Sequence, residues 1–139
     1  GLSTKVLPGD VIADCTMDYE SLASAGSALG TGAVVVIAEG TCMVELLKRS
    51  SRFYYVENCG QCTPCREGTG WLYRLLQKIT QGKSQASDLT LLVDVANRIE
   101  GNTICAFGDA AAWPVQSFIE HYYSEFAYMI KNHGKSIAA

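Results

Sequence analysis

The chain has 139 residues, 48% of them hydrophobic and 18% charged, and its 14 acidic and 11 basic side chains give a net charge of -3. This length suits one domain or two small ones and is sufficient for a hydrophobic core without covalent crosslinks. The mild acidity argues against a nucleic-acid-binding protein, and the longest strongly apolar run, residues 33–38, is far shorter than the roughly 20 residues of a membrane span, so we expect neither nucleic acid as a partner nor direct membrane insertion.

Residues 1–40 carry short strand signals separated by glycines. Val6-Leu7 precedes a Pro8-Gly9 turn, Val11-Ile12 follows it, and residues 33–38 form an apolar, largely β-branched run bounded by glycines. Between them, residues 19–25 predict a short helical turn. Two or three strands and one short helix make only part of a small α+β unit. We expect its open sheet edge to favour self-association of the chain.

From Thr41 onward, the apolar residues recur with a helical period and predict four amphipathic helices. The first has Thr41 as its expected N-cap, and the second stops at Gly82, a residue type that favours a helix end. The stripes expected to face the core are Met43, Leu46, Leu47, Phe53 and Tyr54 on the first helix, and Trp71, Leu72, Leu75, Leu76 and Ile79 on the second.

The third helix has Ser87 or Asp88 as its expected N-cap and ends at Gly101, and the fourth has Pro114 near its first turn, where a missing N–H costs nothing. Their stripes are Leu89, Leu92, Val93, Ala96 and Ile99 on the third, and Val115, Phe118, Ile119, Tyr122, Phe126, Met129 and Ile130 on the fourth. Short loops join the four helices, which is typical of a bundle. The sequence therefore predicts a mainly α fold, with a four-helix bundle over residues 41–133 and a tail at 134–139.

Six cysteines are unevenly distributed along the chain, and three of them, Cys59, Cys62 and Cys65, fall within seven residues. Such bunching favours a metal site or redox chemistry over a disulfide framework. Three thiolates in a tight loop can bind three corners of an iron-sulfur cube, and Cys105 can supply the fourth ligand. This pattern favours one [4Fe-4S] cluster. Zinc, which usually takes paired C-x2-C or mixed Cys/His sets, and disulfides or inert thiols are the alternatives.

The expected ligands lie in two separate loops. Cys65 begins the second helix, whose N-terminus favours the negative charge of a thiolate-ligated cluster, and Arg66 follows it either as a potential-tuning charge or as a solvated residue. Cys105 lies between the third and fourth helices, so this loop must fold back over the first one. Cys15 and Cys42 are isolated and are expected to be small buried hydrophobes. The sequence indicates no catalytic residues.

Three segments closely resemble the family of the NADH-binding flavoprotein subunit of respiratory complex I. They are Cys-Gly-Gln-Cys-Thr-Pro-Cys-Arg-Glu-Gly at residues 59–68, Ile-Glu-Gly-Asn-Thr-Ile-Cys-Ala at 99–106, and Gly-Asp-Ala-Ala-Ala-Trp-Pro-Val at 108–115. The resemblance covers essentially the whole chain. It implies that residues 1–40 are part of a β-grasp (SLBB-like) domain and that Cys59, Cys62, Cys65 and Cys105 ligate a [4Fe-4S] cluster.

In that family the cluster takes electrons from reduced FMN and passes them to an iron-sulfur chain leading to quinone. The FMN and NADH sites lie in an N-terminal domain that nothing here matches, so we expect a C-terminal fragment of an NADH dehydrogenase that does not oxidise NADH by itself. The resemblance implies that its partners are the FMN/NADH-binding domain and neighbouring iron-sulfur subunits. It places the chain on the cytoplasmic side of the bacterial inner membrane or the matrix side of the mitochondrial one.

The same residues are compatible with two other functions. The same four cysteines could staple two loops through zinc or disulfides in a structural interaction module. Alternatively, the chain could belong to the diaphorase subunit of an NAD-linked hydrogenase or formate dehydrogenase, which contains the same subunit type.

Overall fold

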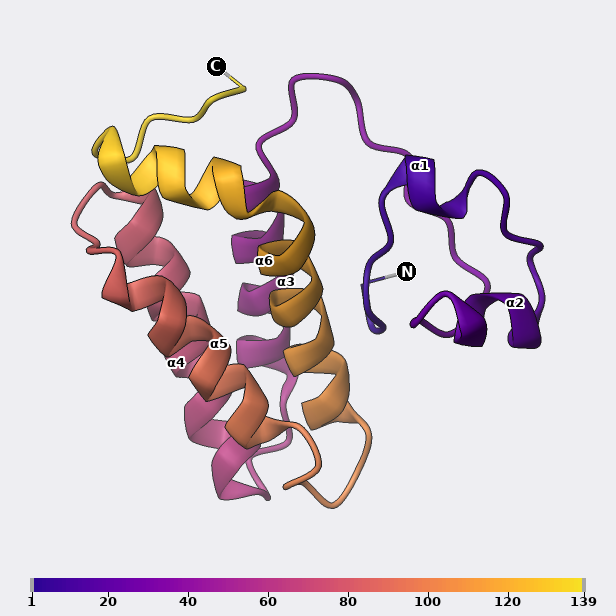
Figure 1. Ribbon diagram of the computed structural model, residues 1–139. Helices are drawn as coiled ribbons and strands as arrows, with labels where there is room; N and C mark the ends of the chain where they lie inside the picture. The colour runs from indigo at the N-terminus through magenta and orange to yellow at the C-terminus, as the bar shows by residue number, and fades with distance from the viewer. Residues whose placement is uncertain (1, 139) are drawn as a thin grey trace.

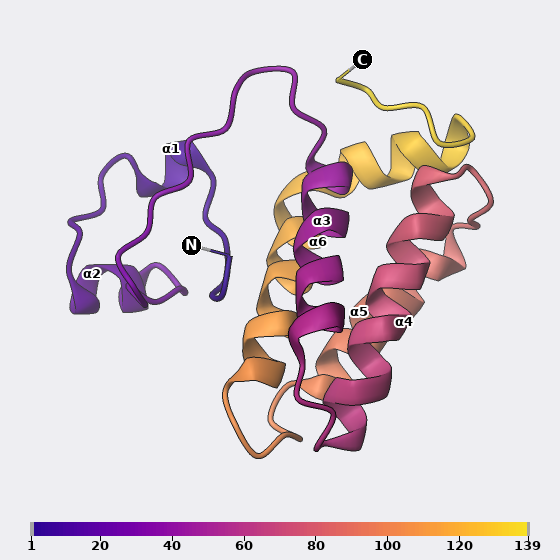
Figure 2. The same ribbon diagram turned by 180° about the vertical axis from the view of Figure 1, so that it is seen from behind.

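A computed structural model describes residues 2–138, and over that range the chain is mainly helical (Figure 1). Its elements are α1 (Gly9–Ile12), α2 (Tyr19–Ser24), α3 (Met43–Glu57), α4 (Thr63–Thr80), α5 (Ser87–Ile99) and α6 (Phe107–Lys131). The four long helices stand together as a bundle, and the segment before α3 forms a smaller lobe beside it (Figures 1 and 2). The prediction of a mainly α fold is confirmed.

The bundle is closed by contacts between successive helices. α3 packs on α4, α4 on α5 and α5 on α6, while α6 returns to α3. The buried core contains residues of all four helices, namely Met43, Val44, Leu47, Leu72, Leu76, Ile79, Leu89, Leu92, Val95, Ala96, Ile99, Ala112, Val115, Phe118, Ile119, Phe126 and Met129. In the part of the chain that the structure describes, no helix is both long and apolar enough to cross a bilayer.

Two expected core positions on the helical stripes are wrong. Phe53 and Trp71 are 57% and 52% exposed, although their neighbours Tyr54 and Leu72 are buried. Each of the two lies next in sequence to the residue that points into the core, and successive residues on a helix do not share a face. The expected N-cap Thr41 is also wrong by one residue, because Cys42 precedes the first turn of α3. The expected N-cap Ser87 or Asp88 is wrong as well, because both residues lie within the first turn of α5 and Ala86 precedes it.

The fourth helix begins seven residues earlier than expected, at Phe107, so Pro114 lies inside α6 rather than in its first turn. Proline removes one intrahelical hydrogen bond, which normally ends or kinks a helix. Here Ala111, Ala112 and Val115 bury one face of α6 on both sides of the proline. Tertiary packing of an apolar face contributes more to helix stability than local propensity, so the helix continues through Pro114.

α6 bends further along, at Tyr122, whose φ of -120° and ψ of 25° are not helical. Beyond this residue the helix turns across the end of the bundle that lies away from the α5–α6 loop (Figure 1). Phe126 and Met129 are buried in this last part. The bend therefore covers that end of the bundle and leaves the opposite end, where α4 begins, to the loops.

No strand is present among residues 2–138, so the strands expected in residues 1–40 do not form in this chain. Val11-Ile12 belong to α1, whereas the short helix expected near residues 19–25 is present as α2. Residues 33–38 have no ladder partner, and Val34 and Val36 are 68% and 93% exposed. A strand needs a neighbour to satisfy its backbone groups, and no second strand lies in the described segment.

The first residues dock onto the bundle. The Val6 N–H donates to Ser117 Oγ on α6 at 2.9 Å, and the Tyr54 hydroxyl on α3 donates to the Leu2 carbonyl at 3.0 Å. Beside these contacts, a cavity of about 650 Å³ separates the N-terminal lobe from Phe118 and Tyr122 of α6. The lobe is thus attached to the bundle mainly through its first few residues.

The turn between α4 and α5 is held by Asp88. Its carboxylate accepts two hydrogen bonds from Lys78 Nζ, at 2.9 and 2.8 Å, and one from the Gln85 N–H at 2.7 Å. Burial opposes ionisation of Asp88, but the bonds from Lys78 and Gln85 outweigh it and hold the pKa of this carboxyl below its ordinary value.

This depressed pKa predicts a loss of stability in acid. The contribution of Asp88 is fully present above the unfolded-state pKa of about 3.9 and is lost as pH falls through the lower folded-state pKa. We expect Asp88→Asn to cost about 1 kcal/mol at pH 7, and we expect this difference from the wild type to shrink below about pH 4. Urea denaturation of the variant and the wild type at pH 7 and pH 3 measures the loss of stability and its decrease in acid. A difference that stays constant between these pH values would contradict the prediction.

Candidate functional site

The predicted ligands lie in two loops at the same end of the bundle (Figure 1). Cys59 follows α3, Cys62 directly precedes α4, and Cys65 occupies the first turn of α4. Cys105 lies in the loop between α5 and α6, two residues before Phe107. Cys65 is buried and Cys62 is half-buried, whereas Cys59 and Cys105 are exposed. The four cysteines thus range from exposed positions in the loops to a buried one at the start of α4.

A direct contact joins the two loops. The backbone N–H of Ile104, next to Cys105, donates to Cys62 Sγ at 3.3 Å. Burial raises the pKa of the Cys65 thiol, and the nearby charges of Cys105, Cys62 and Cys59 raise it further. The hydrogen bond from Ile104 places the second loop directly against the first. The expectation that the second loop folds back over the first is therefore confirmed.

The four cysteines of the two loops have the chemistry that a [4Fe-4S] cluster needs. All four cysteines are free thiols. Tetrahedral zinc with bonds of about 2.3 Å would bring its sulfur ligands to about 3.8 Å from one another. Among residues 2–138, no three Cys, His, Asp or Glu side chains converge tightly enough to hold one ion. A [4Fe-4S] cluster takes one thiolate on each of four irons, and the four free thiols at this end of the bundle supply that number of ligands.

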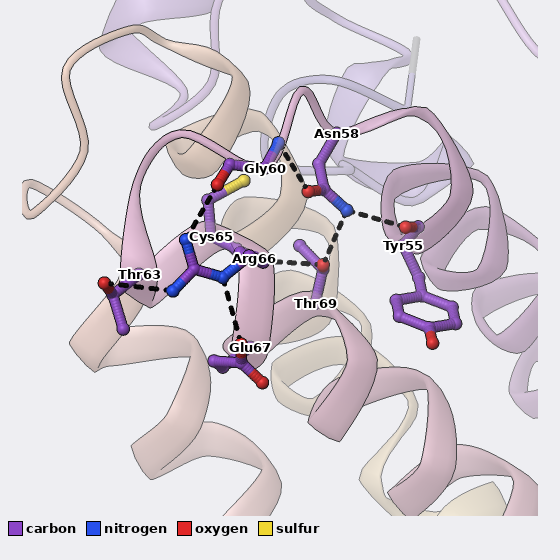
Figure 3. A network of polar contacts seen from close by, with 8 residues as sticks. All are labelled: Tyr55, Asn58, Gly60, Thr63, Cys65, Arg66, Glu67 and Thr69. Atoms are coloured by element: carbon purple, nitrogen blue, oxygen red, sulfur yellow. Dashed lines mark hydrogen bonds and ion pairs between the residues drawn. The ribbon is translucent and has the colours of Figure 1, made fainter.

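Asn58 fixes the start of the cysteine loop (Figure 3). Its Nδ2 donates to the Tyr55 carbonyl at the end of α3 at 2.6 Å, and its Oδ1 accepts the Gly60 N–H at 3.0 Å. Gly60 has a φ of 77°, a conformation that glycine adopts without strain. The Thr69 hydroxyl donates to the Cys65 carbonyl at 2.7 Å and lies 3.5 Å from Asn58 Nδ2. This network ties Cys65 to the turn that contains Cys59.

The second loop is fixed by its own polar contacts. The Gly101 N–H donates to Asp109 Oδ1 in the first turn of α6 at 2.7 Å, and the Thr103 hydroxyl donates to the Cys105 carbonyl at 2.9 Å. Gly108 packs directly against Thr103, since a Cβ at Gly108 would lie 2.4 Å from Thr103 Oγ1. The position of Cys105 therefore depends on the close approach of α6 to the loop.

Close packing of α4 against α3 and α5 supports the two cysteine loops. A Cβ at Gly68 of α4 would lie 2.7 Å from Ile99 Cδ1 of α5, and one at Gly70 would lie 2.9 Å from Tyr55 Cε2 of α3. Both glycines occur within five residues of Cys65. They let α4 approach α3 on one side and α5 on the other, next to the two cysteine loops.

Glu100 joins the end of α5 to α6 just before the second loop. Its carboxylate accepts hydrogen bonds from Trp113 Nε1 and from Gln116 Nε2, both at 2.7 Å. Hydrogen bonds from Gln116 and Trp113 hold the pKa of Glu100 below its ordinary value. The group is thus ionised at neutral pH and uses both of its oxygens to hold α6.

Glu100→Gln is expected to destabilise the protein by about 1–3 kcal/mol, because the new amide N–H2 faces one of two hydrogen-bond donors. Urea denaturation at pH 7 measures the loss, and Glu120→Gln, at an exposed position of α6, is the matched control with the same change of charge. Equal stability of the two variants would contradict the role of Glu100.

The structure adds residues that the sequence did not indicate. Asn58, Thr69 and Glu100 support the cysteine loops, and the Ile104 backbone N–H points to a cysteine sulfur. Asn two residues before a glycine is a known turn signal, but the partners of Glu100 depend on tertiary contacts. The two isolated cysteines are half-buried and not fully buried as expected: Cys42 packs against the core, and Cys15 lies beside the cavity of the N-terminal lobe.

Comparison with known families gives a match over most of the bundle. The family described as the NADH-ubiquinone oxidoreductase-F iron-sulfur binding region matches residues 45–129. This range contains all four cysteines of the two loops, and the family description supports a [4Fe-4S] cluster as the bound group.

Individual proteins are similar over nearly the whole chain. An F subunit of the NADH-quinone oxidoreductase of Rhizobium meliloti is 48% identical over 90% of this chain, and the F subunit of the Rickettsia felis enzyme is 46% identical over 99%. This chain spans 29% and 32% of the length of these two relatives. The crystal structure of an NAD+-reducing [NiFe]-hydrogenase in the H2-reduced state superposes with a TM-score of 0.77 and 28% identity, over 94% of this chain and 22% of that one.

Proposed function

Since the chain belongs to the family of the NADH-ubiquinone oxidoreductase-F iron-sulfur binding region, we propose that it is an electron-transfer module. In this proposal, Cys59, Cys62, Cys65 and Cys105 are the ligands of one [4Fe-4S] cluster. The cluster lies between a flavin donor, reduced FMN in another part of an NADH:quinone oxidoreductase, and an iron-sulfur acceptor on the way to quinone.

The single observation that carries the proposal is the contact between the two loops. The Ile104 N–H donates to Cys62 Sγ at 3.3 Å, so the residue before Cys105 lies against the first loop although the two are 42 residues apart in sequence. When bound, a [4Fe-4S] cluster supplies reversible one-electron chemistry. The protein would hold the thiolates in place and donate the Ile104 N–H to sulfur, and these effects, with the exposure of the site, would set the reduction potential.

The site offers a short path for electrons to the surface. Cys59 and Cys105 are exposed, and the side chain of Ile104 between the loops is 84% exposed. Cys65 is buried in the first turn of α4 and would anchor the cluster to this helix. Electrons can therefore enter and leave at the loop end of the bundle, with no need for a residue that performs acid-base or nucleophilic chemistry.

The decisive measurement is the iron, zinc and acid-labile sulfide content of anaerobically purified protein, with an EPR spectrum after dithionite reduction. The expected result is about four irons and four sulfides per chain and the signal of a reduced cluster. Zinc in place of iron would favour the structural interaction module instead. Disulfides without metal would also contradict the proposal.

We also propose domain bounds, partners and a location for the chain. We divide the chain into a partial β-grasp segment (1–40), an iron-sulfur-binding bundle (41–133) and a tail (134–139), which is supported by the exposed apolar run at 33–38 and by the start of α3 at Met43. The FMN/NADH-binding domain and neighbouring iron-sulfur subunits are the proposed partners, and self-association through the exposed run is a further one. The proposed location is the cytoplasmic side of the bacterial inner membrane or the matrix side of the mitochondrial one.

A second candidate is the corresponding subunit of an NAD-linked hydrogenase or formate dehydrogenase. The structural similarity to an NAD+-reducing [NiFe]-hydrogenase favours it, but the identity of 28% is lower than the 46–48% shared with the NADH-quinone oxidoreductase proteins. The role of the four cysteines is the same in both candidates.

A further inference from the structure

Arg66 contacts the cysteine loop from the first turn of α4 (Figure 3). Its Nη1 donates to the Gly60 carbonyl at 2.8 Å, its Nη2 lies 3.5 Å from Thr63 Oγ1, and its Nε pairs with Glu67 Oε1 at 3.0 Å. The planar guanidinium holds these three acceptors at once, which a lysine ammonium cannot do with the same geometry. Arg66 therefore connects the loop before α4 to the helix itself.

Gly60 is held from both sides. Its N–H donates to Asn58 Oδ1 at 3.0 Å, and its carbonyl accepts from Arg66 Nη1 at 2.8 Å. Asn58 is anchored to the end of α3, and Arg66 is anchored to α4. The peptide groups between Cys59 and Cys62 are thus fixed relative to Cys65 by the two side chains.

The guanidinium also places a positive charge next to the cysteine loop. Its side chain is 46% exposed, so solvent screens this charge in part, and Glu67 balances it on the side facing away from Gly60. A thiolate-ligated cluster is anionic, and reduction adds one more negative charge. A nearby cation therefore stabilises the reduced form relative to the oxidised form.

We propose that Arg66 is a positioning residue for the cluster, which holds the Cys59–Cys62 turn through the Gly60 carbonyl and raises the reduction potential through its charge. This inference rests on the proposed function, because it concerns the same four cysteines. It goes further by assigning a role to a residue that is not a ligand, and it separates a geometric effect from an electrostatic one.

Two variants separate these effects, and a third is the control. Arg66→Gln removes both the positive charge and the planar guanidinium that holds the three acceptors. Arg66→Lys keeps the charge but loses the guanidinium geometry. Arg74→Gln makes the same change of charge on an exposed position of α4, about 12 Å further along the helix axis. Each protein is purified anaerobically, its iron and sulfide are counted, its midpoint potential is titrated by EPR, and its release of iron to a chelator is timed.

The expected results differ between the variants. Arg66→Gln keeps about four irons but has a potential lower by about 59 mV, which is a tenfold smaller equilibrium constant for one-electron reduction. Arg66→Lys keeps the wild-type potential. Both release iron about tenfold faster than the wild type, as expected when a group that supports a ligand is lost. Arg74→Gln behaves like the wild type in both measurements.

Other outcomes would overturn the inference. A full cluster with an unchanged potential in Arg66→Gln, or equal shifts in Arg66→Gln and Arg74→Gln, contradicts the electrostatic role. If Arg66→Gln assembles no cluster, the positioning role is tested with Arg66→Lys alone. Release of iron from Arg66→Lys as slow as from the wild type would contradict that role. Wild-type protein that holds no iron would overturn the proposed function itself, a result distinct from an intact cluster that is indifferent to Arg66.

Discussion

Substitution of Cys105 by serine is expected to abolish the four-iron cluster while the helical bundle stays folded. A serine hydroxyl remains protonated at neutral pH and is a poorer ligand for iron than a soft thiolate. Cys105 is exposed and lies outside the core, so its replacement removes no buried apolar contact. Iron and sulfide counts below about four per chain and a changed EPR spectrum, with unchanged far-UV circular dichroism, are the expected results.

Cys42→Ser is the matched control for this experiment. Cys42 precedes α3 at the end of the helix opposite to Cys59, about 20 Å away along its axis. The same sulfur-to-oxygen exchange there should leave the cluster intact. An unchanged iron content and spectrum in Cys105→Ser would rule out Cys105 as a ligand, and cluster loss in Cys42→Ser would show that the effect is not specific to the loop end.

The bundle was predictable from the sequence because the apolar pattern of each helix extends over several turns. Each helix carries an apolar stripe with a 3.6-residue period, and Gly82 and Gly101 mark two helix ends. The errors arose where tertiary contacts outweigh local propensity. α6 continues through Pro114 because residues on both sides of it are buried, and residues 33–38 form no strand because a β-branched run needs a pairing partner that the described residues do not contain.

The meeting of the two cysteine loops was predictable from the sequence, but the residues that support these loops were not. The spacing of Cys59, Cys62 and Cys65 and the distant Cys105 were sufficient to expect that two loops meet, and the Ile104 contact agrees with that expectation. The partners of Asn58 and Arg66 depend on loop conformations that periodicity does not determine. The same holds for the close approach of Gly108 to Thr103, which joins residues of a loop and a helix.

Gly108→Ala is expected to destabilise the protein and to weaken the cluster together. A Cβ at this position would lie 2.4 Å from Thr103 Oγ1, 2.5 Å from Cγ2 and 2.9 Å from Cβ, so a bond rotation of Thr103 cannot remove the overlap. Either α6 or the loop with Cys105 must move. Such overpacking costs about 1–3 kcal/mol, although alanine favours a helix over glycine by about 1 kcal/mol. Denaturation in urea and the iron content after chelator challenge measure the two effects.

A double-mutant cycle with Thr103→Ala tests the cause. This second change removes Oγ1 and Cγ2, and it also removes the hydrogen bond to the Cys105 carbonyl, so it is destabilising by itself. If the overlap is the cause, Gly108→Ala should cost less in the Thr103→Ala background than in the wild type, because the two closest approaches are gone and only the 2.9 Å approach to Cβ remains. Gly9→Ala, at the start of α1 with no atom within 4 Å of the added Cβ, should leave the cluster unaffected. Additive losses in the cycle would mean that the effect of Gly108→Ala does not arise from Thr103, and that the position of Cys105 does not depend on this contact.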